Sequence, residues 1–204
     1  MSLSRTRAAA LALAVTAATA LATTSLAAPA QAAGGKRTFS HFDDGSFESP
    51  KVPANSFTEP VAGQSIGPWQ VTSGSVDLIG AGFWQAAEGD QSVDLNGADS
   101  GTIAQTFTTT PGATYSVSYA LAGNPGGGPA LRTGRVLIDG QDFQDFSFDV
   151  TGKTRAAMGY VGRQFSFVAY NSSTTLTFES TVRGPFGPVL DDVRVKECKS
   201  CCGG

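Results

Sequence analysis

Apolar and polar side chains alternate along most of the chain beyond residue 40. The clearest run covers residues 114–121, where Tyr115, Val117, Tyr119 and Leu121 alternate with alanine or hydroxyl-bearing residues. A period of two is typical of a β-strand that buries one face. We therefore predict a strand here, with these four side chains pointing into a core.

A similar run includes Ile103 and Phe107, and the sequence TPGA at residues 110–113 separates it from residues 114–121. Proline fixes φ near the value that a tight turn needs, and glycine tolerates a positive φ. The pattern predicts a β-hairpin that lies centrally in a sheet.

Shorter alternating runs recur through the rest of the chain, and no long window has the spacing of an amphipathic helix. They cover residues 69–79, 92–96, 135–138, 143–150, 165–169, 176–178 and 189–195. Roughly eight to ten short strands joined by turns predict an all-β fold, an antiparallel two-sheet β-sandwich of the jelly-roll type. Residues 50–68 hold four prolines and are predicted to be a long surface loop.

The start of the chain has the features of a secretory signal peptide. Arg5 and Arg7 precede an Ala- and Leu-rich run, which ends in the small-x-small cleavage pattern AQA at residues 30–32. We expect a secreted, extracellular protein, and retention of this run as an uncleaved membrane anchor is the alternative. The predicted organisation is a signal peptide at 1–32, a linker at 33–40, a β-sandwich domain at 41–196 and a Cys-rich tail at 197–204.

Charge narrows the classes of partner. The full chain has 14 basic and 17 acidic residues, and it becomes more acidic once Arg5 and Arg7 are removed with the signal peptide. An acidic domain is not expected to bind nucleic acid or an anionic membrane surface. No later apolar run is long enough to span a bilayer, so no membrane contact is expected after cleavage.

Five blocks of sequence, in this order, resemble one known family. They are FxDGSFE at 42–48, WQVTSGSVDLI at 69–79, EGDQSVDLNG at 88–97, GTIAQTFTTTPGATYSVSYALAGNP at 101–125 and GPVLDDVRV at 187–195. The chain is similar to the domain-of-unknown-function 642 family, found in plant cell-wall proteins and in the bacterial choice-of-anchor C surface proteins. The resemblance implies a galactose-binding-like jelly roll and a carbohydrate ligand.

Acidic residues stand at both ends of the predicted domain: Asp43, Asp44 and Glu48 at the start, Asp191 and Asp192 at the end. Terminal strands of a sandwich commonly run side by side, and Ca²⁺ prefers carboxylate and carbonyl oxygens. In many jelly-roll carbohydrate-binding modules that the sequence resembles, an N-terminal Glu and a C-terminal Asp hold a structural calcium. We predict such a site here, with solvated charges and turn residues as the alternative.

Aromatic side chains are the candidates for sugar binding, because the apolar C–H faces of sugar rings stack on them while hydroxyls need polar partners. The aromatic candidates are Trp84 and Tyr160, followed by Trp69 and Tyr119. The hydrogen-bonding candidates are Asn124, Arg132, Asp94, Asn96 and Gln85. The alternative for each aromatic residue is a place in the core.

Catalysis is not expected. Glu88 with Asp90 or Asp94 is one imaginable acid–base pair of a glycosidase, but spacing alone does not place two carboxylates in one cleft. His41 is the only histidine, and the sequence has no G-x-S-x-G, no H-E-x-x-H and no phosphate-binding glycine loop.

The tail holds all three cysteines, Cys198, Cys201 and Cys202. In an oxidising compartment, Cys198 is predicted to pair with Cys201 or Cys202, because a bond between vicinal cysteines is sterically harder. An odd count leaves one thiol for an intermolecular bridge, so a disulfide-linked dimer is one expected outcome.

Two functions follow from these observations. The first is a secreted, non-catalytic carbohydrate-binding module that recognises cell-wall or biomass polysaccharide. The second is a structural or adhesive extracellular protein that binds protein partners, or dimerises through its tail, without a sugar site. A solvent-exposed aromatic platform near Trp84 would favour the first function, and a buried Trp84 would favour the second.

Overall fold

The computed structural model describes residues 42–198. The predicted signal peptide and linker, His41, Cys201 and Cys202 lie outside the described residues. Within 42–198, no helix is long and apolar enough to cross a membrane.

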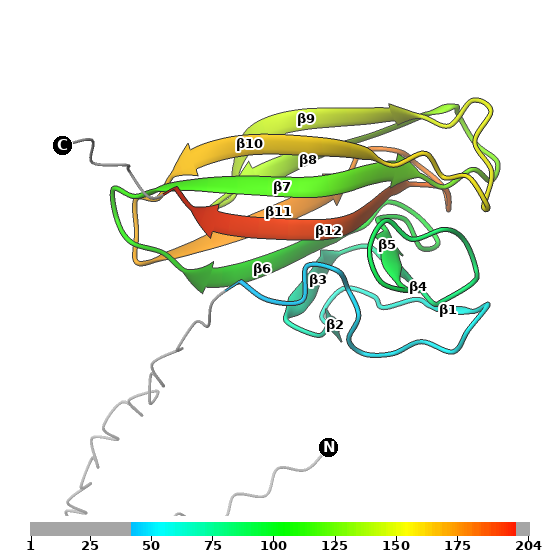
Figure 1. The fold of residues 1–204 in the computed structure, drawn as a ribbon, viewed down its shortest axis with the longest axis horizontal. Coiled ribbons are helices and arrows are strands. Elements are labelled where there is room, and N and C mark those ends of the chain that lie inside the picture. The colour runs from blue at the N-terminus through cyan, green and yellow to red at the C-terminus, as the bar shows by residue number, and fades with distance from the viewer. Residues whose placement is uncertain (1–41, 199–204) are drawn as a thin grey trace, which may run out of the picture. The chain divides into compact units, whose positions relative to one another are not determined.

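The described residues form two antiparallel sheets of six strands each, which stack on one another (Figure 1). The first sheet has the order β1 (Phe57–Thr58), β4 (Asp77–Ile79), β5 (Ser92–Asp94), β12 (Pro188–Glu197), β7 (Thr114–Gly123) and β10 (Val161–Val168). The second has the order β2 (Ser65–Ile66), β3 (Trp69–Ser73), β6 (Thr102–Thr108), β11 (Ser173–Ser180), β8 (Leu131–Ile138) and β9 (Gln141–Asp149). The predicted all-β antiparallel sandwich is confirmed.

The core lies between the two sheets and follows the predicted alternation. Tyr115, Val117, Tyr119 and Leu121 of β7 are all buried, whereas the residues between them up to position 120 are partly exposed. The Tyr119 ring packs edge-on against Phe178 of β11 in the opposite sheet, with 5.1 Å between ring centroids. Burying side chains of this size contributes about 1.5–3 kcal/mol each.

The predicted hairpin at residues 103–121 is wrong in its pairing. The turn forms, and the amide of Ala113 donates to the carbonyl of Thr110 at 3.0 Å. However, β6 pairs with β3 and β11, whereas β7 pairs with β10 and β12, so the turn leads from one sheet to the other. Alternation predicts which face of a strand is buried but not which strand lies beside it, and both strands bury a face in the same core.

Residues 50–68 form a surface loop as predicted, except for the two-residue strands β1 and β2 within it. Ile66 and Val52 anchor this loop to the core. Such short strands are below the length at which alternation can be recognised. With them, residues 42–198 contain twelve strands, whereas eight to ten were expected.

The two ends of the domain are held together. The last strand, β12, lies between β5 and β7 rather than at an edge. The amide of Val193 in β12 donates to the carbonyl of Gly45 at 2.8 Å. A Cβ atom at position 45 would lie 1.8 Å from the Val193 carbonyl oxygen, so only glycine allows this contact. The expectation that the acidic N- and C-terminal segments run side by side is thus met.

Candidate ligand-binding site

Three of the predicted sugar-stacking residues are core residues. Trp69 is fully buried, and its indole N–H donates to the Asp44 carbonyl at 3.0 Å. Tyr119 is 2% exposed, and burial raises the pKa of its hydroxyl to about 12. Trp84 is 6% exposed, and its indole N–H donates to the Ser92 hydroxyl at 2.8 Å. At most 6% of each residue is exposed, so none of these three rings offers a free face to a ligand.

The loop that carries Trp84 packs against a segment distant in sequence, residues 151–160. The amide of Gln85 donates to the Arg155 carbonyl at 2.8 Å, and the Gln85 side chain accepts from the Met158 amide at 3.1 Å. Met158 is fully buried. Tyr160, at the end of this segment, is partly buried, and burial raises the pKa of its hydroxyl. Gln85 thus links the two segments, and Tyr160 packs against the core.

Arg132 and Asn124 hold a loop in place rather than pointing into solvent. Arg132 is 0% exposed. Its guanidinium donates to the carbonyl of Asn124 at 2.6 and 3.1 Å, to that of Gly127 at 2.7 Å, and to those of Gly126 and Pro129. The loop 124–130 is therefore wrapped around one buried cation.

The side chains of Asp94 and Asn96 continue this polar network. Asp94 is fully buried and accepts from the amides of Asn96 at 2.9 Å and Gly187 at 3.0 Å, and from the Asn124 side chain at 2.8 Å. Asn96 donates to the carbonyls of Val182 and Gly184 at 2.7 and 2.6 Å. The hydrogen-bonding candidates thus stabilise loops at this end of the sandwich.

Burial strongly raises the pKa of three carboxyl groups in the domain. Asp94 and Asp77 lie directly opposite each other on β5 and β4. Burial raises the pKa of Asp94 to about 8 and that of Asp77 to about 7, with neighbouring negative charges adding to both shifts. Burial likewise raises the pKa of Asp191 to about 7, although three backbone amides oppose the shift.

The predicted calcium ligands are occupied with backbone amides. Glu48 accepts from the amides of Asp90 and Gln91 at 2.6 and 2.8 Å, and Asp191 accepts from those of Ala87 and Glu88 at 2.7 and 3.0 Å. Glu48, near the start of the domain, and Asp191, near its end, therefore both bind the backbone of the loop 87–91.

The remaining three acidic candidates also have other partners or face outward. Asp44 accepts from the amides of Glu48 and Ser49, Asp192 pairs with Arg194 at 2.6 Å, and Asp43 is exposed. No three acidic, histidine or cysteine side chains among residues 42–198 converge on a point that suits a metal ion. These side chains do not form a calcium cage in this arrangement, and calcium binding stays a prediction.

Melting the protein with and without EDTA tests both roles of Glu48. We expect Glu48→Ala to lower the free energy of unfolding by about 2 kcal/mol, because two amides of the loop lose their acceptor. Glu88→Ala, in the same loop, is the matched control and should change it little. EDTA lowers Tm of the wild type if an ion is held, and an unchanged curve would remove the calcium site.

One long side of the sandwich differs from these packed regions. Strand β10 forms one edge of the first sheet, β9 forms one edge of the second, and the two strands lie next to each other (Figure 1). The rings of Phe143 in β9 and Phe165 in β10 contact each other, with 5.1 Å between centroids. The Arg163 guanidinium donates across the same gap to the Ser147 carbonyl at 3.2 Å.

A hollow of about 480 Å³ opens at one end of this side, and we call it the aromatic groove. Tyr170, Phe143 and Val168 line it with 85%, 44% and 46% of their surface exposed. Its polar lining residues are Asp139, Gln141, Ser166 and Thr114. Exposed aromatic faces beside hydrogen-bonding groups are the combination that the sequence led us to expect near Trp84.

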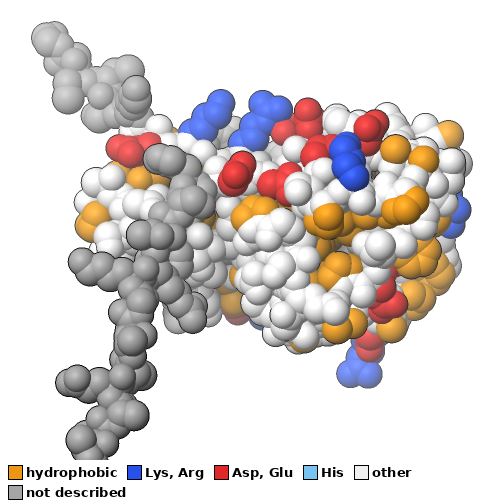
Figure 2. Space-filling view, turned by 90° about the horizontal axis from the view of Figure 1, so that it is seen from below, with side chains coloured by type: hydrophobic (Ala, Val, Ile, Leu, Met, Phe, Trp, Pro, Cys, Tyr) orange, Lys and Arg blue, Asp and Glu red, His pale blue; other side chains and the backbone are white. Residues whose placement is uncertain are grey.

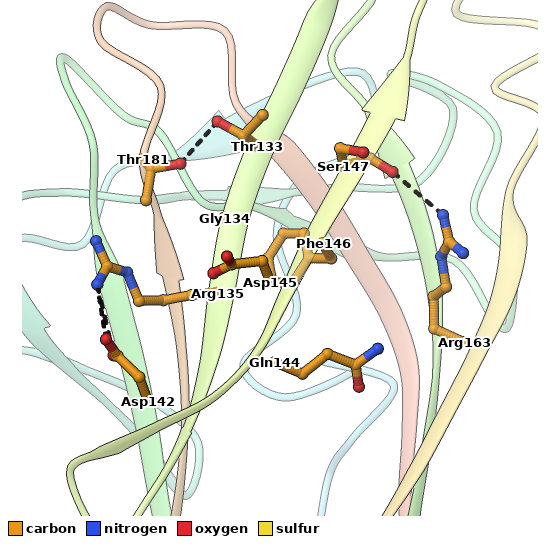
Figure 3. A pocket seen from close by; sticks show the side chains of 10 residues that line it. All are labelled: Thr133, Gly134, Arg135, Asp142, Gln144, Asp145, Phe146, Ser147, Arg163 and Thr181. Carbon is orange, nitrogen blue, oxygen red and sulfur yellow. Dashed lines mark hydrogen bonds and ion pairs between the residues drawn. The ribbon is translucent and has the colours of Figure 1, made fainter.

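A second hollow of about 570 Å³ lies beside β8 and β9, and we call it the polar cleft (Figure 3). The guanidinium of Arg135 points at the Asp142 carboxylate, 3.2 Å away, and the hydroxyls of Thr133 and Thr181 lie 2.7 Å apart. Arg163 forms the opposite wall. The cleft is therefore rich in groups that bind hydroxyls.

The face seen from below in Figure 2 carries apolar side chains mainly over the half of the domain that holds β1–β5, and charged side chains mainly along one border. The exposed apolar residues of the β1 segment are Phe57 and Val61, each 46% exposed. Neither residue lines the aromatic groove or the polar cleft.

Comparison with known proteins agrees with the sequence blocks described above. Residues 40–196 match the family described as "Protein of unknown function (DUF642)". The chain belongs to this family. Among curated proteins, the DUF642 domain is 27% identical over 132 residues to Halomucin of Haloquadratum walsbyi, which is 63% of this chain and 1% of Halomucin. The chain thus spans only about a hundredth of that relative.

Solved structures with a similar fold include two family 35 carbohydrate-binding modules. That of Paenibacillus barcinonensis is 16% identical, with a TM-score of 0.45, over 68% of this chain and 98% of the other. That of Clostridium thermocellum is 17% identical, with a TM-score of 0.47, over 70% of this chain and 99% of the other. At these identities the likeness concerns the fold alone.

Sequence reasoning about the DUF642 domain missed Tyr170 and Phe143, although one signal was present. Phe165, Phe167 and Ala169 alternate inward, so Tyr170 falls on the opposite parity and points outward. Phe143 likewise falls on the opposite parity from the buried Phe146 and Phe148, and a β-bulge between β8 and β9 leaves it without an opposite residue.

Proposed function

We propose that this DUF642 protein is a secreted, non-catalytic carbohydrate-binding domain that recognises polysaccharide of a cell wall or of biomass. The observation that carries the proposal is the aromatic groove. Its exposed rings, Tyr170 and Phe143, suit the C–H faces of sugar rings, and its polar rim suits their hydroxyls. A hollow of about 480 Å³ is of the size that small ligands occupy in proteins.

The geometry around the imagined acid–base pair supports a non-catalytic role. The carboxylate of Asp94 is fully buried and bonded to three donors, while Glu88 and Asp90 are exposed on the loop above. A pair for glycoside hydrolysis needs two carboxylates that flank one open cleft. Asp94 is closed off from any such cleft.

Retention on insoluble polysaccharides tests the proposal. We expect the purified protein to be retained on at least one of cellulose, xylan, chitin, pectin and peptidoglycan. Tyr170→Ala should weaken retention about tenfold or more, which corresponds to about 1.4 kcal/mol. The matched control is Phe57→Ala, which removes an exposed ring from β1, at the opposite edge of the first sheet from β10.

Tyr170 is 85% exposed, so the Tyr170→Ala protein should melt like the wild type. No retention on any of the five polysaccharides would overturn the proposal. Equal loss in the Tyr170→Ala and Phe57→Ala proteins would remove the aromatic groove as the site.

The second candidate is a structural or adhesive protein without a sugar site, and the burial of Trp84 favours it. Cys198 is exposed and has no disulfide partner among residues 42–198, which is compatible with a disulfide-linked dimer. Loss of all polysaccharide retention, together with a dimer that dissociates in reductant, would support this candidate over the first.

A further inference from the structure

The aromatic groove and the polar cleft follow one another along the same two strands. On β9, Gln141 and Phe143 line the groove, whereas residues 142 and 144–147 line the cleft. On β10, residues 166–168 line the groove and Arg163 lines the cleft. From Phe143 to Ser147 an antiparallel strand advances about 14 Å, which is longer than a single sugar ring.

The polar cleft contains hydrogen-bonding groups that the fold does not use. The side chains of Gln144 and Asp145 are exposed, and neither forms a hydrogen bond or ion pair with another residue of 42–198. Figure 3 draws no interaction from either of them to the other residues of the cleft. Arg163 makes one hydrogen bond, to the Ser147 carbonyl, which leaves most of its N–H groups for other acceptors.

The charges in the cleft are balanced. The residues that line the cleft include two arginines, Arg135 and Arg163, and two aspartates, Asp142 and Asp145. Glu179, which is not among the lining residues, lies 3.9 Å from Arg135. With a formal net charge of −3, the whole chain gives no attraction for a polyanion. Balanced charges with unused donors and acceptors suit a ligand that is rich in hydroxyls and carries no charge.

We propose that the aromatic groove and the polar cleft are consecutive parts of one track, which binds an extended, uncharged polysaccharide chain along its length. One sugar ring stacks on Tyr170 and Phe143, and the following rings hydrogen-bond to Gln144, Asp145 and Arg163. The inference rests on the proposed carbohydrate-binding function and adds the class of ligand, a chain segment rather than a single sugar or a chain terminus.

Titration calorimetry with defined oligosaccharides tests the track. The probes are cello-, xylo- and chito-oligosaccharides of one to six units, with oligogalacturonides as the charged counterpart. We expect affinity for one uncharged series to rise at least tenfold from the monosaccharide to the hexasaccharide. A monosaccharide that binds as tightly as the hexasaccharide, or binding of the charged series alone, would overturn the track.

Variants in the polar cleft and in the aromatic groove distinguish a ligand that spans both from one that binds in the groove alone. Gln144→Ala should weaken hexasaccharide binding about fivefold or more and leave disaccharide binding unchanged, whereas Tyr170→Ala should weaken both. Gln70→Ala is the matched control, because Gln70 is an exposed glutamine on β3 of the same sheet. If Gln144→Ala behaves like Gln70→Ala, the cleft is not part of the site.

The result also distinguishes the track from the proposed function. Retention on a polysaccharide without any dependence on oligosaccharide length would sink the track and leave carbohydrate binding standing. Absence of both retention and oligosaccharide binding would sink both.

Discussion

Replacing Arg132 with methionine is expected to lower the free energy of unfolding by about 3 kcal/mol, one of the largest effects of any single change in this domain. Methionine keeps much of the buried length of the side chain but removes every donor. The carbonyls of Asn124, Gly126, Gly127 and Pro129 then lose their shared partner. Urea unfolding followed by tryptophan fluorescence measures the change, since Trp69 and Trp84 are both buried.

The matched control is Arg135→Met on the same strand. Arg135 is 35% exposed and its ion pairs lie at the surface, so its loss should cost less than about 1 kcal/mol. Hydrogen exchange should become faster in the loop 124–130 of the Arg132→Met protein only. Equal destabilisation by the two changes would show that Arg132 does not organise this loop.

Stability is expected to fall as pH rises from about 4 to about 8. Asp94, Asp77 and Asp191 have pKa values of about 8, 7 and 7 in the folded protein, against about 4 in an unfolded chain. Between these values the folded state binds more protons than the unfolded state, so raising the pH favours unfolding. Since one pKa unit corresponds to about 1.4 kcal/mol, we expect a loss of about 3 kcal/mol or more between pH 5 and pH 9.

The Asp94→Asn protein isolates the largest contribution. Asparagine keeps an acceptor for the amides of Asn96 and Gly187 but cannot ionise, so the fall of stability with pH should become shallower. Asp99 and Asp149, whose pKa values are lowered by hydrogen bonds, act in the opposite direction and lose their contribution as the pH falls below about 4. A wild-type stability that rises steadily from pH 5 to pH 9 would contradict the shifts at all three buried carboxyls.

The sequence predicted the sandwich because alternation reports burial, and burial is what the two sheets share. It could not predict that β6 and β7 lie in different sheets, because their inward faces are equally apolar in either arrangement. The five sequence blocks identified the family for the same reason that they predicted the fold, since they contain the strands and the turns that join them.

The candidate site was less predictable than the fold. Residue type marks Trp69, Trp84 and Tyr170 equally as rings able to stack on a sugar, but only the tertiary structure decides which ring is covered. Trp84 is buried because the segment 151–160, distant in sequence, closes over it. Conversely, Phe143 has the opposite parity from the buried Phe146 and Phe148, but parity alone does not show that its ring meets Phe165 across the gap between β9 and β10.

The position of β12 in the middle of the first sheet determines when the protein can fold during its synthesis. The strands β5 and β7 have no common neighbour until residues 188–197 pair between them, and Gly45 has no partner until Val193 is in place. Contacts of such long sequence separation form late and slowly. The first sheet therefore closes only after residues 188–197 have emerged from the ribosome, and a chain truncated before β12 should remain unfolded.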